Sequence, residues 1–327
     1  MKAVVLVGGE GTRLRPLTFT TPKQMLPVGG KPMIERVIGR LGSYGITGVV
    51  LSLGYKPDAF LKAYPDGRCA GLAIEYAVEA EPLDTAGAIA FAAREAGIDD
   101  TFAVLNGDVL TCLDVGELIR FHKDREAEAT IALTPVEDPS RFGVVPTDRE
   151  GRVIEFIEKP ARDEAPTNLI NAGTYVLEPS VIERIPTGRR VSIERETFPA
   201  IAKDGALYAL ASDAYWVDAG TPATYLAANL RYVAPPGPAV DIEDGAKVTS
   251  SVIGDGVKVG AGAVVHESVL FDRAVVGAGA EVTSSILGRG AVVEKDAVVA
   301  DLSVIGDEAV VPANDQIVGG RLPSSNE

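Results

Sequence analysis

The sequence predicts an α/β protein in two parts: a Rossmann-like domain with a mostly parallel sheet, then a C-terminal left-handed parallel β-helix of hexapeptide repeats. Two observations predict this fold. Apolar, strand-like runs alternate with helical stretches up to about residue 233, which is the pattern of an open sheet with helices on both faces. From Ile242 onward a six-residue rhythm replaces that alternation, and such a rhythm is typical of a β-helix.

The strands and helices of the first part follow one another in sequence. KAVVLVGG indicates a buried strand, KPMIERVIGRLGSYG a helix that a glycine stops, and GVVLSLGY the next strand. AGAIAFAAREAG indicates a helix, and TFAVLNGD returns to a strand. Ligands of such sheets bind beyond the carboxyl ends of the strands. We therefore expect the functional residues in the loops that follow the strands.

Clustered proline and glycine in VAPPGPAV mark the boundary between the two parts, because both residues disfavour helices and central strands. We expect the first domain over residues 1–233, a Pro/Gly linker over 234–240, the β-helix over 241–320 and a tail over 321–327. An aliphatic residue begins each repeat, and some repeats are one residue short. Three repeats form one triangular coil, so the sequence predicts about four coils. We expect the β-helix to serve assembly into a homo-oligomer.

Composition excludes several classes of protein. A formal charge of −15 argues against nucleic acid or an anionic membrane as a partner, and no apolar run approaches the roughly 20 residues that span a bilayer. The N-terminus lacks the pattern of a signal peptide, and two cysteines give no disulfide framework. These features indicate the cytoplasm. Six Lys/Arg nevertheless gather within residues 10–40, which indicates either a small anionic ligand or a chance cluster.

The segment GGEGTRLRP directly follows the first predicted strand and contains the glycines and arginines of a possible phosphate site. It matches neither the P-loop motif nor the dinucleotide fingerprint, which requires a glycine at the position of Leu14. Backbone N–H groups of such a segment can still bind an anion, and Arg13 and Arg15 would add charge-assisted hydrogen bonds. Taken alone, the segment is as compatible with a plain structural turn as with a phosphate-binding loop.

The longer string GGEGTRLRPLT…TPKQMLP resembles the signature of the sugar-1-phosphate nucleotidylyltransferases, which make NDP-sugars. Further blocks of that family occur in order: EPLDTAGAIA, LNGDVL, RFGVVP, FIEKP, INAGTYVLEP, VSIERETFP and YWVDAGTP. The resemblance covers essentially the whole chain and is greatest to the guanylyltransferases that act on mannose 1-phosphate. It implies nucleotidyl transfer from an NTP to a sugar 1-phosphate. GTP with mannose 1-phosphate is the first choice, and dTTP or UTP with glucose 1-phosphate the second.

The resemblance also implies the site residues. Arg13, Lys23, Asp108 and Asp218 would be catalytic, the two aspartates by binding Mg²⁺. The positions implied for nucleotide binding are Gly8, Gly9, Gly11, Thr12, Arg13, Pro82, Asp84, Thr85 and Gly107. The positions implied for the sugar phosphate are Gly143, Glu158, Lys159, Asn171 and Gly173, with Glu194 as a further candidate. Without the resemblance, Lys23 would be a solvated turn lysine and both aspartates turn residues.

One position departs from the family pattern, which commonly has EPLGTAG where this chain has EPLDTAG. Asp84 therefore stands where a glycine lets the backbone approach the base, and its carboxylate would either accept hydrogen bonds from guanine or turn outward. The expected chemistry is direct attack by the sugar phosphate on the α-phosphorus. It needs no histidine, and the chain has only His122, in a polar predicted helix, and His266.

Two other functions remain open from the sequence. One is a bifunctional protein whose β-helix also transfers acyl groups with His266 as base. The other is a regulatory homologue that binds an NDP-sugar without turnover. The presence of the implied phosphate and metal residues favours catalysis over the second.

Overall fold

The computed structural model describes residues 1–54, 57–233 and 235–323 and divides into two compact units. The first, the sheet unit, contains residues 1–9 and 34–216, and the second, the β-helix unit, contains residues 10–33 and 217–327. Residues 10–33, which leave the first strand, thus group with the β-helix and not with the sheet. The expected domain bounds remain predictions. Tyr55 of one predicted strand, Ala234 of the linker and residues 324–327 of the tail lie outside the described residues.

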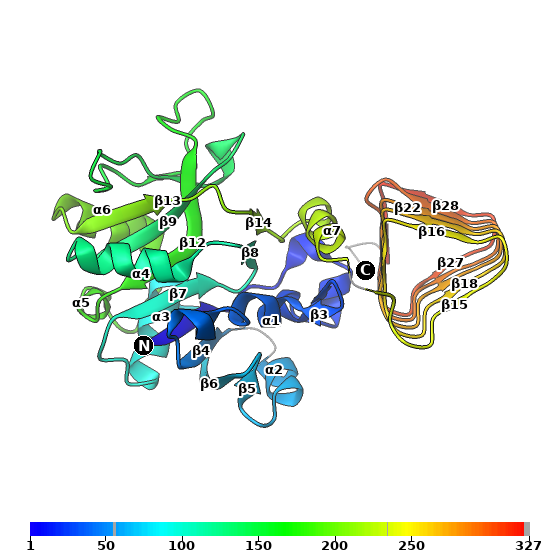
Figure 1. Ribbon diagram of the computed structural model, residues 1–327, viewed down its shortest axis with the longest axis horizontal. Coiled ribbons are helices and arrows are strands. Elements are labelled where there is room, and N and C mark those ends of the chain that lie inside the picture. The colour runs from blue at the N-terminus through cyan, green and yellow to red at the C-terminus, as the bar shows by residue number, and fades with distance from the viewer. Residues whose placement is uncertain (55–56, 234, 324–327) are drawn as a thin grey trace. The chain divides into compact units, whose positions relative to one another are not determined.

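Over the described residues the sheet unit is built on one ten-stranded sheet (Figure 1). Its members are β1 (Lys2–Leu6), β4 (Gly48–Leu53), β5 (Arg68–Cys69), β6 (Leu72–Val78), β7 (Phe102–Asn106), β9 (Ala129–Pro135), β10 (Gly143–Val144), β11 (Ile157–Glu158), β12 (Leu169–Leu177) and β13 (Leu207–Ala211). The central order β7-β1-β4-β6 is parallel. Strand β12 pairs antiparallel with both β7 and β9, and β13 is parallel to β9. The predicted parallel-rich sheet is confirmed, with antiparallel strands added at its sides.

Helices cover both faces of this sheet, as predicted. They are α1 (Met33–Ile38), α2 (Pro57–Ala63), α3 (Asp84–Glu95), α4 (Val115–Asp124), α5 (Ser180–Glu183) and α6 (Phe198–Lys203), with a short strand β8 (Val109–Thr111) after β7. Helix α3 contacts β1, β4 and β6 and shares its core with Ala129 and Ile131 of β9. Helix α4 contacts β9 from the other side, where Thr130 points, because successive side chains of a strand alternate between its faces.

The helix predicted between Lys31 and Gly45 is shorter than expected. Helix α1 ends at Ile38, and a separate 3₁₀ turn, Leu41–Tyr44, ends at Gly45 in the left-handed region with φ 83°. Gly39 and Gly42 lie between these stops. Glycine costs about 1 kcal/mol relative to alanine inside a helix, so the glycines interrupt a helix that the apolar spacing alone would continue.

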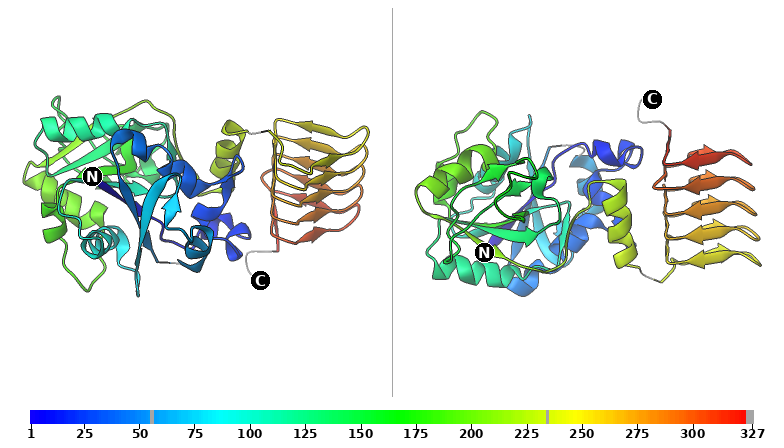
Figure 2. Two further views of the ribbon diagram at one scale, coloured as in Figure 1. Left: turned by 60° about the horizontal axis from the view of Figure 1, so that its bottom comes forward. Right: turned by 90° about the horizontal axis from the view of Figure 1, so that it is seen from above.

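Over the described residues, the strands of the β-helix form three five-stranded parallel sheets. They are β15 (Asp241–Ile242), β18 (Lys258–Val259), β21 (Val275–Val276), β24 (Val292–Val293) and β27 (Val310–Val311); β16 (Lys247–Thr249), β19 (Val264–His266), β22 (Glu281–Thr283), β25 (Val298–Ala300) and β28 (Gln316–Val318); and β17 (Val252–Ile253), β20 (Val269–Leu270), β23 (Ile286–Leu287), β26 (Val304–Ile305) and β29 (Arg321–Leu322). Figure 1 looks along the triangular coils and Figure 2 shows them stacked. The predicted β-helix is confirmed.

The spacing of the coils explains the imperfect repeat. Equivalent residues of neighbouring coils lie 17 or 18 positions apart, so most coils are one residue short of three hexapeptides. The inward aliphatic positions stack from coil to coil: Val259, Val276 and Val293 are buried in one continuous core. Within the described residues each sheet has five strands, so there are five coils where about four were expected.

Apart from the coils, the β-helix unit contains one helix and a segment of short turns and strands. The segment, residues 10–33, contains three 3₁₀ turns (Thr12–Leu14, Leu17–Phe19, Lys23–Met25) and the two-residue strands β2 (Pro27–Val28) and β3 (Lys31–Pro32). Strand β14 (Trp216–Asp218) leads into α7 (Pro222–Arg231). Thr221 caps α7 by accepting from the Thr224 N–H at 3.3 Å, with Pro222 at the first position.

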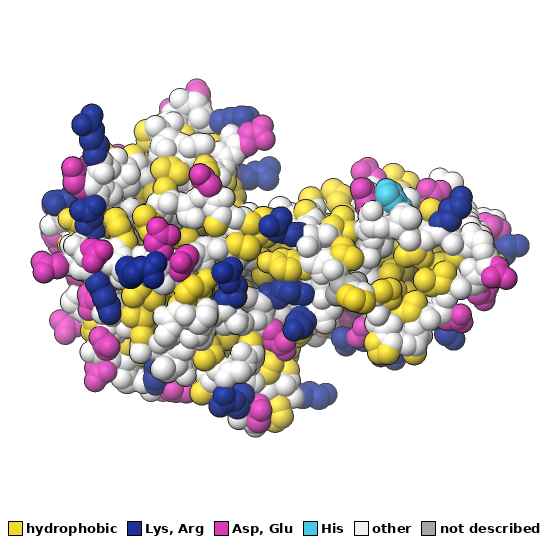
Figure 3. All heavy atoms as spheres, in the orientation of Figure 1, with side chains coloured by type: hydrophobic (Ala, Val, Ile, Leu, Met, Phe, Trp, Pro, Cys, Tyr) yellow, Lys and Arg dark blue, Asp and Glu magenta, His cyan; other side chains and the backbone are white. Residues whose placement is uncertain are grey.

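Neither described unit contains a helix that is long and apolar enough to cross a membrane. The face drawn in Figure 3 carries acidic and basic side chains intermixed.

His122 corrects one expectation from the sequence. It lies on α4, but its side chain is only 1% exposed, so it belongs to the buried face of that helix. Its Nδ1 lies 2.8 Å from the Thr130 hydroxyl and its Nε2 lies 2.9 Å from a carboxylate oxygen of Glu178. A carboxylate only accepts, so we assign the ring proton to Nε2 and let Thr130 donate to Nδ1. Burial lowers the pKa of His122 below its ordinary value of 6.5.

This burial predicts a pH dependence of stability. A folded-state pKa below the unfolded value means that the unfolded chain takes the proton first, so stability is complete above about pH 6.5 and decreases as the pH falls below it. The slope that His122 adds approaches at most about 1.4 kcal/mol per pH unit. Urea unfolding of wild type and His122→Asn between pH 7 and pH 5 should show a steeper loss in wild type. Parallel profiles would contradict this assignment.

Candidate active site

The glycines after β1 leave free space beside the backbone of the predicted phosphate segment. A Cβ built on Gly8 or on Gly9, which has φ 95°, would meet no atom within 4 Å. Gly11 differs, because its φ of 63° and its packing both require glycine: a Cβ there would lie 2.9 Å from Cγ2 of Thr18 and 3.2 Å from Cβ of Lys23. Thr12 begins the 3₁₀ turn that follows. Gly11 thus holds this turn close against Thr18 and Lys23.

Arg13 and Asp218 form an ion pair within the β-helix unit, with Nη2 and Oδ2 3.7 Å apart. The arginine side chain is 61% exposed and the aspartate side chain 28% exposed, so the pair lies at the surface with the guanidinium accessible. Gly220 leaves room for it, because a Cβ at Gly220 would lie 2.6 Å from Nη2 of Arg13 and 2.7 Å from Oδ1 of Asp218. Sequence analysis brought out Asp218 of the block YWVDAGTP but missed Gly220.

Lys23 starts the third 3₁₀ turn of the segment and is only 8% exposed. Lysine is rarely buried unless it has a partner. Its burial excludes the alternative of a solvated turn lysine, and its Cβ packs close to Gly11.

In the sheet unit, the turn after β7 lies beside the end of β1. The Gly107 N–H donates to the Leu6 carbonyl at 2.8 Å, and the half-buried Asp108 follows directly. Gly173 of β12 packs on Asn106: its φ is 70°, and a Cβ there would lie 2.5 Å from the Asn106 side-chain nitrogen. These residues gather at the carboxyl ends of parallel strands, where ligands of such sheets bind.

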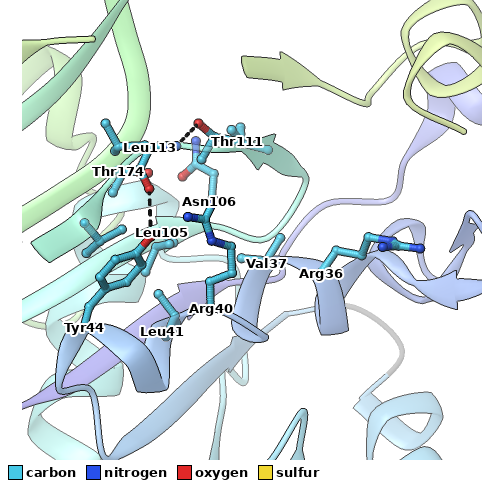
Figure 4. Close-up of a pocket in the computed structure, with 12 residues that line it drawn as sticks. Arg36, Val37, Arg40, Leu41, Tyr44, Leu105, Asn106, Thr111, Leu113 and Thr174 are labelled. Carbon is cyan, nitrogen blue, oxygen red and sulfur yellow. Dashed lines mark hydrogen bonds between the residues drawn. The ribbon is translucent and has the colours of Figure 1, made fainter. Parts of the chain in front are cut away.

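A small cavity of about 30 Å³ lies beside Asn106 (Figure 4). Arg40 extends toward Asn106 in this view, whereas Arg36 points away from it. Tyr44 and Thr111 both hydrogen-bond to the backbone of Leu113. Pockets for ligands of nucleotide size measure several hundred Å³, so this cavity is far too small to hold a nucleotide.

The residues expected on the sugar side surround β10 and β11. Gly143 pairs with Glu158 across these strands, and a Cβ on Gly143 would collide with the ring of Phe156. Lys159 has a left-handed φ of 51°, and its Nζ lies 3.2 Å from a carboxylate oxygen of Glu158. Its side chain is 58% exposed, so the ammonium can reach an incoming anion.

Asn171 holds the shape of the bulge in β12. Its Oδ1 accepts from the Gly173 N–H at 2.9 Å, and its Nδ2 donates to the Tyr175 hydroxyl at 2.9 Å. The pairing of β12 with β9 shifts register between Asn171 and Tyr175. The structure thus shows Asn171 engaged with its own strand, a role that sequence reasoning did not foresee.

Sequence analysis also missed the aromatic residues beside this bulge. Trp216 donates its indole N–H to the Ala172 carbonyl at 2.9 Å, and Phe142 meets the indole edge-on at 5.6 Å between ring centroids. Both residues stand in blocks that carried the resemblance, YWVDAGTP and RFGVVP, so the signal was present. What the sequence lacked was the fold that brings the two blocks together.

The residues expected near the base surround the start of α3. Asp84 has φ 62°, a conformation that glycine adopts freely and aspartate tolerates, which fits the glycine that the family commonly has there. Its Oδ1 accepts from the Thr85 N–H at 2.8 Å. Thr85 donates to Glu194 at 2.8 Å and accepts from the Ile193 N–H at 2.8 Å. Pro82 is exposed nearby in sequence, and Glu194 lies here, at the helix start.

Asp108 and Asp218, the predicted metal ligands, are described separately, because Asp108 belongs to the sheet unit and Asp218 to the β-helix unit. Both are carboxylates at or just after a strand end, and Mg²⁺ takes one or two carboxylates with phosphate and water oxygens completing its shell. The donor chemistry therefore fits. Throughout the described residues no cluster of three or more His, Cys, Asp or Glu side chains could hold a metal alone.

Comparison with known proteins identifies the family. The family model described as "Nucleotidyl transferase" matches residues 2–234. The chain belongs to the nucleotidyl transferase family. A second model, "GMPPB C-terminal domain", matches residues 236–321, which include the β-helix.

Two relatives and one solved structure carry informative names. The "Mannose-1-phosphate guanylyltransferase" of Mycobacterium tuberculosis is 44% identical over 79% of this chain and 76% of its own length. The "Mannose-1-phosphate guanyltransferase" of Aspergillus oryzae is 44% identical over 71% of this chain, and the match spans 64% of that relative. The crystal structure of HddC from Yersinia pseudotuberculosis complexed with GMP-PN has a TM-score of 0.61 at 31% identity, covering 71% of this chain and 99% of HddC.

The close approach of Gly220 to Arg13 and Asp218 predicts that a side chain at position 220 will lower activity. Gly220→Ala places a Cβ 2.6 Å from Nη2 of Arg13, which displaces the guanidinium from Asp218. We expect nucleotidyl transfer to fall about tenfold in kcat/KM, roughly the effect of one charge-assisted contact, while the melting temperature stays close to wild type.

The matched control is Gly48→Ala, at the start of β4, where a Cβ would meet its nearest atom at 3.8 Å. We expect this variant to keep wild-type kinetics. A Gly220→Ala enzyme as active as Gly48→Ala would show that the arginine does not need its place beside Asp218.

Proposed function

We propose that this nucleotidyl transferase converts GTP and mannose 1-phosphate to GDP-mannose and pyrophosphate. One observation carries the proposal: the glycine-opened segment after β1 bears an exposed Arg13 held by Asp218, in a family whose named relatives act on mannose 1-phosphate. The HddC complex with GMP-PN supports a guanine nucleotide in a related fold.

Arg13 and Lys23 would hold the triphosphate of the nucleotide and the phosphate of the sugar. The reaction brings two polyanions together and releases a third, so positive groups must offset charge on the departing pyrophosphate. The fork of N–H groups on the Arg13 guanidinium matches phosphate oxygens, and Lys23 would add a positive charge from a largely buried position. The glycines Gly8, Gly9 and Gly11, with Thr12 and Gly107, would present backbone N–H groups to the same phosphates.

Asp108 and Asp218 would hold Mg²⁺, which when bound neutralises phosphate charge and orients the phosphates. Asp218 has a second task in this proposal, because its ion pair sets the direction of the Arg13 side chain. Asp108 is placed by the short bond between Gly107 and the end of β1.

Lys159 would meet the phosphate of the sugar, and Glu158 and Asn171 would hydrogen-bond sugar hydroxyls. Gly143 and Gly173 would leave space for the sugar ring. The phosphate oxygen of the sugar is already ionised near neutral pH, so it attacks the α-phosphorus in line without a general base. The enzyme contributes positioning and charge.

Pro82, Asp84 and Thr85 would lie near the base. With one oxygen of Asp84 on the Thr85 N–H, its other oxygen would accept from the guanine N1–H or N2–H₂. A site that hydrogen-bonds such a donor discriminates strongly against a base that lacks it.

We also propose that the chain acts in the cytoplasm as a homo-oligomer assembled through the β-helix. Sedimentation at micromolar concentration should then show no monomer peak.

The experiment that tests the function is pyrophosphate release with Mg²⁺, for GTP, dTTP, UTP and ATP, each with the 1-phosphates of mannose, glucose, galactose and N-acetylglucosamine. We expect a clear maximum for GTP with mannose 1-phosphate. A maximum for dTTP or UTP with glucose 1-phosphate would keep the reaction and change the substrates. No release with any pair would favour the regulatory homologue.

The metal assignment predicts that Asp108→Asn and Asp218→Asn each lose at least about 100-fold in Mg²⁺-dependent turnover, because a neutral amide replaces a charged oxygen ligand. Steady-state kinetics across Mg²⁺ concentrations measures this loss. Asp213→Asn, on the exposed turn before β14, is the control and should behave as wild type. Near-normal turnover of Asp108→Asn would remove that residue from the metal site.

A further inference from the structure

The segment that carries Arg13 and Lys23 is bonded to the end of the β-helix. The Thr20 hydroxyl donates to Oδ2 of Asp307 at 2.7 Å. On β29, the strand that pairs with β26, Arg321 donates from Nη1 to the Arg15 carbonyl at 2.9 Å. All these residues belong to the β-helix unit, so the contacts lie inside one compact body.

The β-helix meets the segment at one corner of its coils. A Cβ built on Gly254 or Gly288 of this corner would lie 2.6 Å from a backbone nitrogen of the next coil. At Gly306, the equivalent glycine after β26, the nearest atoms among the described residues are Cβ and Cγ of Pro16, both at 3.0 Å. Pro16 therefore packs directly against this corner of the β-helix.

Helix α7 holds the other end of the segment. Asn229, which is fully buried, accepts from the Gly29 N–H at 2.9 Å, and the Tyr225 hydroxyl donates to the Pro27 carbonyl. The Tyr225 ring in turn meets Phe271 edge-on at 6.5 Å, and Phe271 stands at the same corner as Gly306. The segment is thus tied at residues 15–20 and at 27–29, with Lys23 between the ties.

The segment has little structure of its own to keep these side chains in place. It consists of three-residue 3₁₀ turns and two-residue strands, and such short pieces do not hold their shape without external contacts. The stacked coils beside it form a continuous buried core from Val259 to Val311. A rigid support of this kind is what a precise charged site requires.

We propose that Asp307 and Arg321 of the β-helix are positioning residues for nucleotidyl transfer, which fix the segment that presents Arg13 and Lys23 to the nucleotide. The β-helix then has a role in substrate binding in addition to assembly. The kinetic consequence rests on the function proposed above, whereas the ordering of the segment does not.

The sharpest variant is Thr20→Val, which keeps the shape of the side chain, removes the donor to Asp307 and leaves the coils untouched. We expect a threefold to tenfold loss in kcat/KM for the nucleotide, about the effect of one net hydrogen bond, chiefly through a higher KM. Thr20→Ser retains a hydroxyl and should restore the wild-type value. The melting temperature of both variants should stay within about 2 °C of wild type.

Asp307→Ala needs a matched control, because Oδ1 of Asp307 also accepts from the Arg289 N–H of the neighbouring coil at 2.8 Å. Asp272 makes the same coil-to-coil bond, to the Asp255 N–H at 3.0 Å. Asp272→Ala should therefore remove an equivalent coil-to-coil hydrogen bond and keep wild-type kinetics. Asp307→Ala should raise KM as Thr20→Val does. Equal kinetic losses in both alanine variants, or none in Thr20→Val, would overturn the proposal.

Hydrogen exchange of the full chain without substrate separates this proposal from the proposed function. Thr20→Val should speed exchange of amides in residues 11–26, such as the Leu14 N–H bonded to Gly11, and Asp272→Ala should not. Faster exchange in a protein that transfers nothing would uphold the positioning and refute the function. Unchanged exchange in an active enzyme would refute the positioning alone.

Discussion

The close packing at Gly11 is the constraint on which the site depends. Its left-handed φ of 63° turns the chain as it leaves β1, and the absence of a Cβ lets Thr18 and Lys23 pack against it. The Gly11 carbonyl accepts from the Leu14 N–H and from the Thr18 hydroxyl, so one residue organises both sides of the turn. Arg13, two positions on, is thereby set beside Asp218. A larger residue at position 11 would have to move all of these groups.

The residues proposed for the reaction are found in both units. Arg13, Lys23 and Asp218 belong to the β-helix unit, while Asp108, the residues expected on the sugar side and the start of α3 belong to the sheet unit. Some polar side chains of the site are placed by short local bonds, such as those that Asn171 makes within its own bulge. Others are placed by contacts between segments far apart in sequence, such as Thr85 with Glu194 in the sheet unit and Thr20 with Asp307 in the β-helix unit.

This difference explains how much the sequence could predict. Periodicity located β1, β4, α3 and β7, because buried strands and helices have their own apolar spacing, and the hexapeptide rhythm predicted the β-helix. The sequence showed that Asp84 departs from the family pattern, which commonly has glycine at this position. Its φ of 62° is a conformation that glycine adopts freely, which gives a physical reason for that glycine. The buried face of α4 at His122 and the space kept by Gly220 were not predictable, because both depend on side chains that approach only in the fold. The grouping of residues 10–33 with the β-helix is of the same kind.

The central claim is that the segment after β1 binds the nucleotide phosphates through Arg13. Calorimetric titration of Mg²⁺–GTP into wild type and Arg13→Gln tests it without requiring turnover. Loss of a charge-assisted pair of hydrogen bonds should weaken binding by about 10- to 100-fold, with the fold intact by circular dichroism. An unchanged Kd for Mg²⁺–GTP in Arg13→Gln would contradict the account.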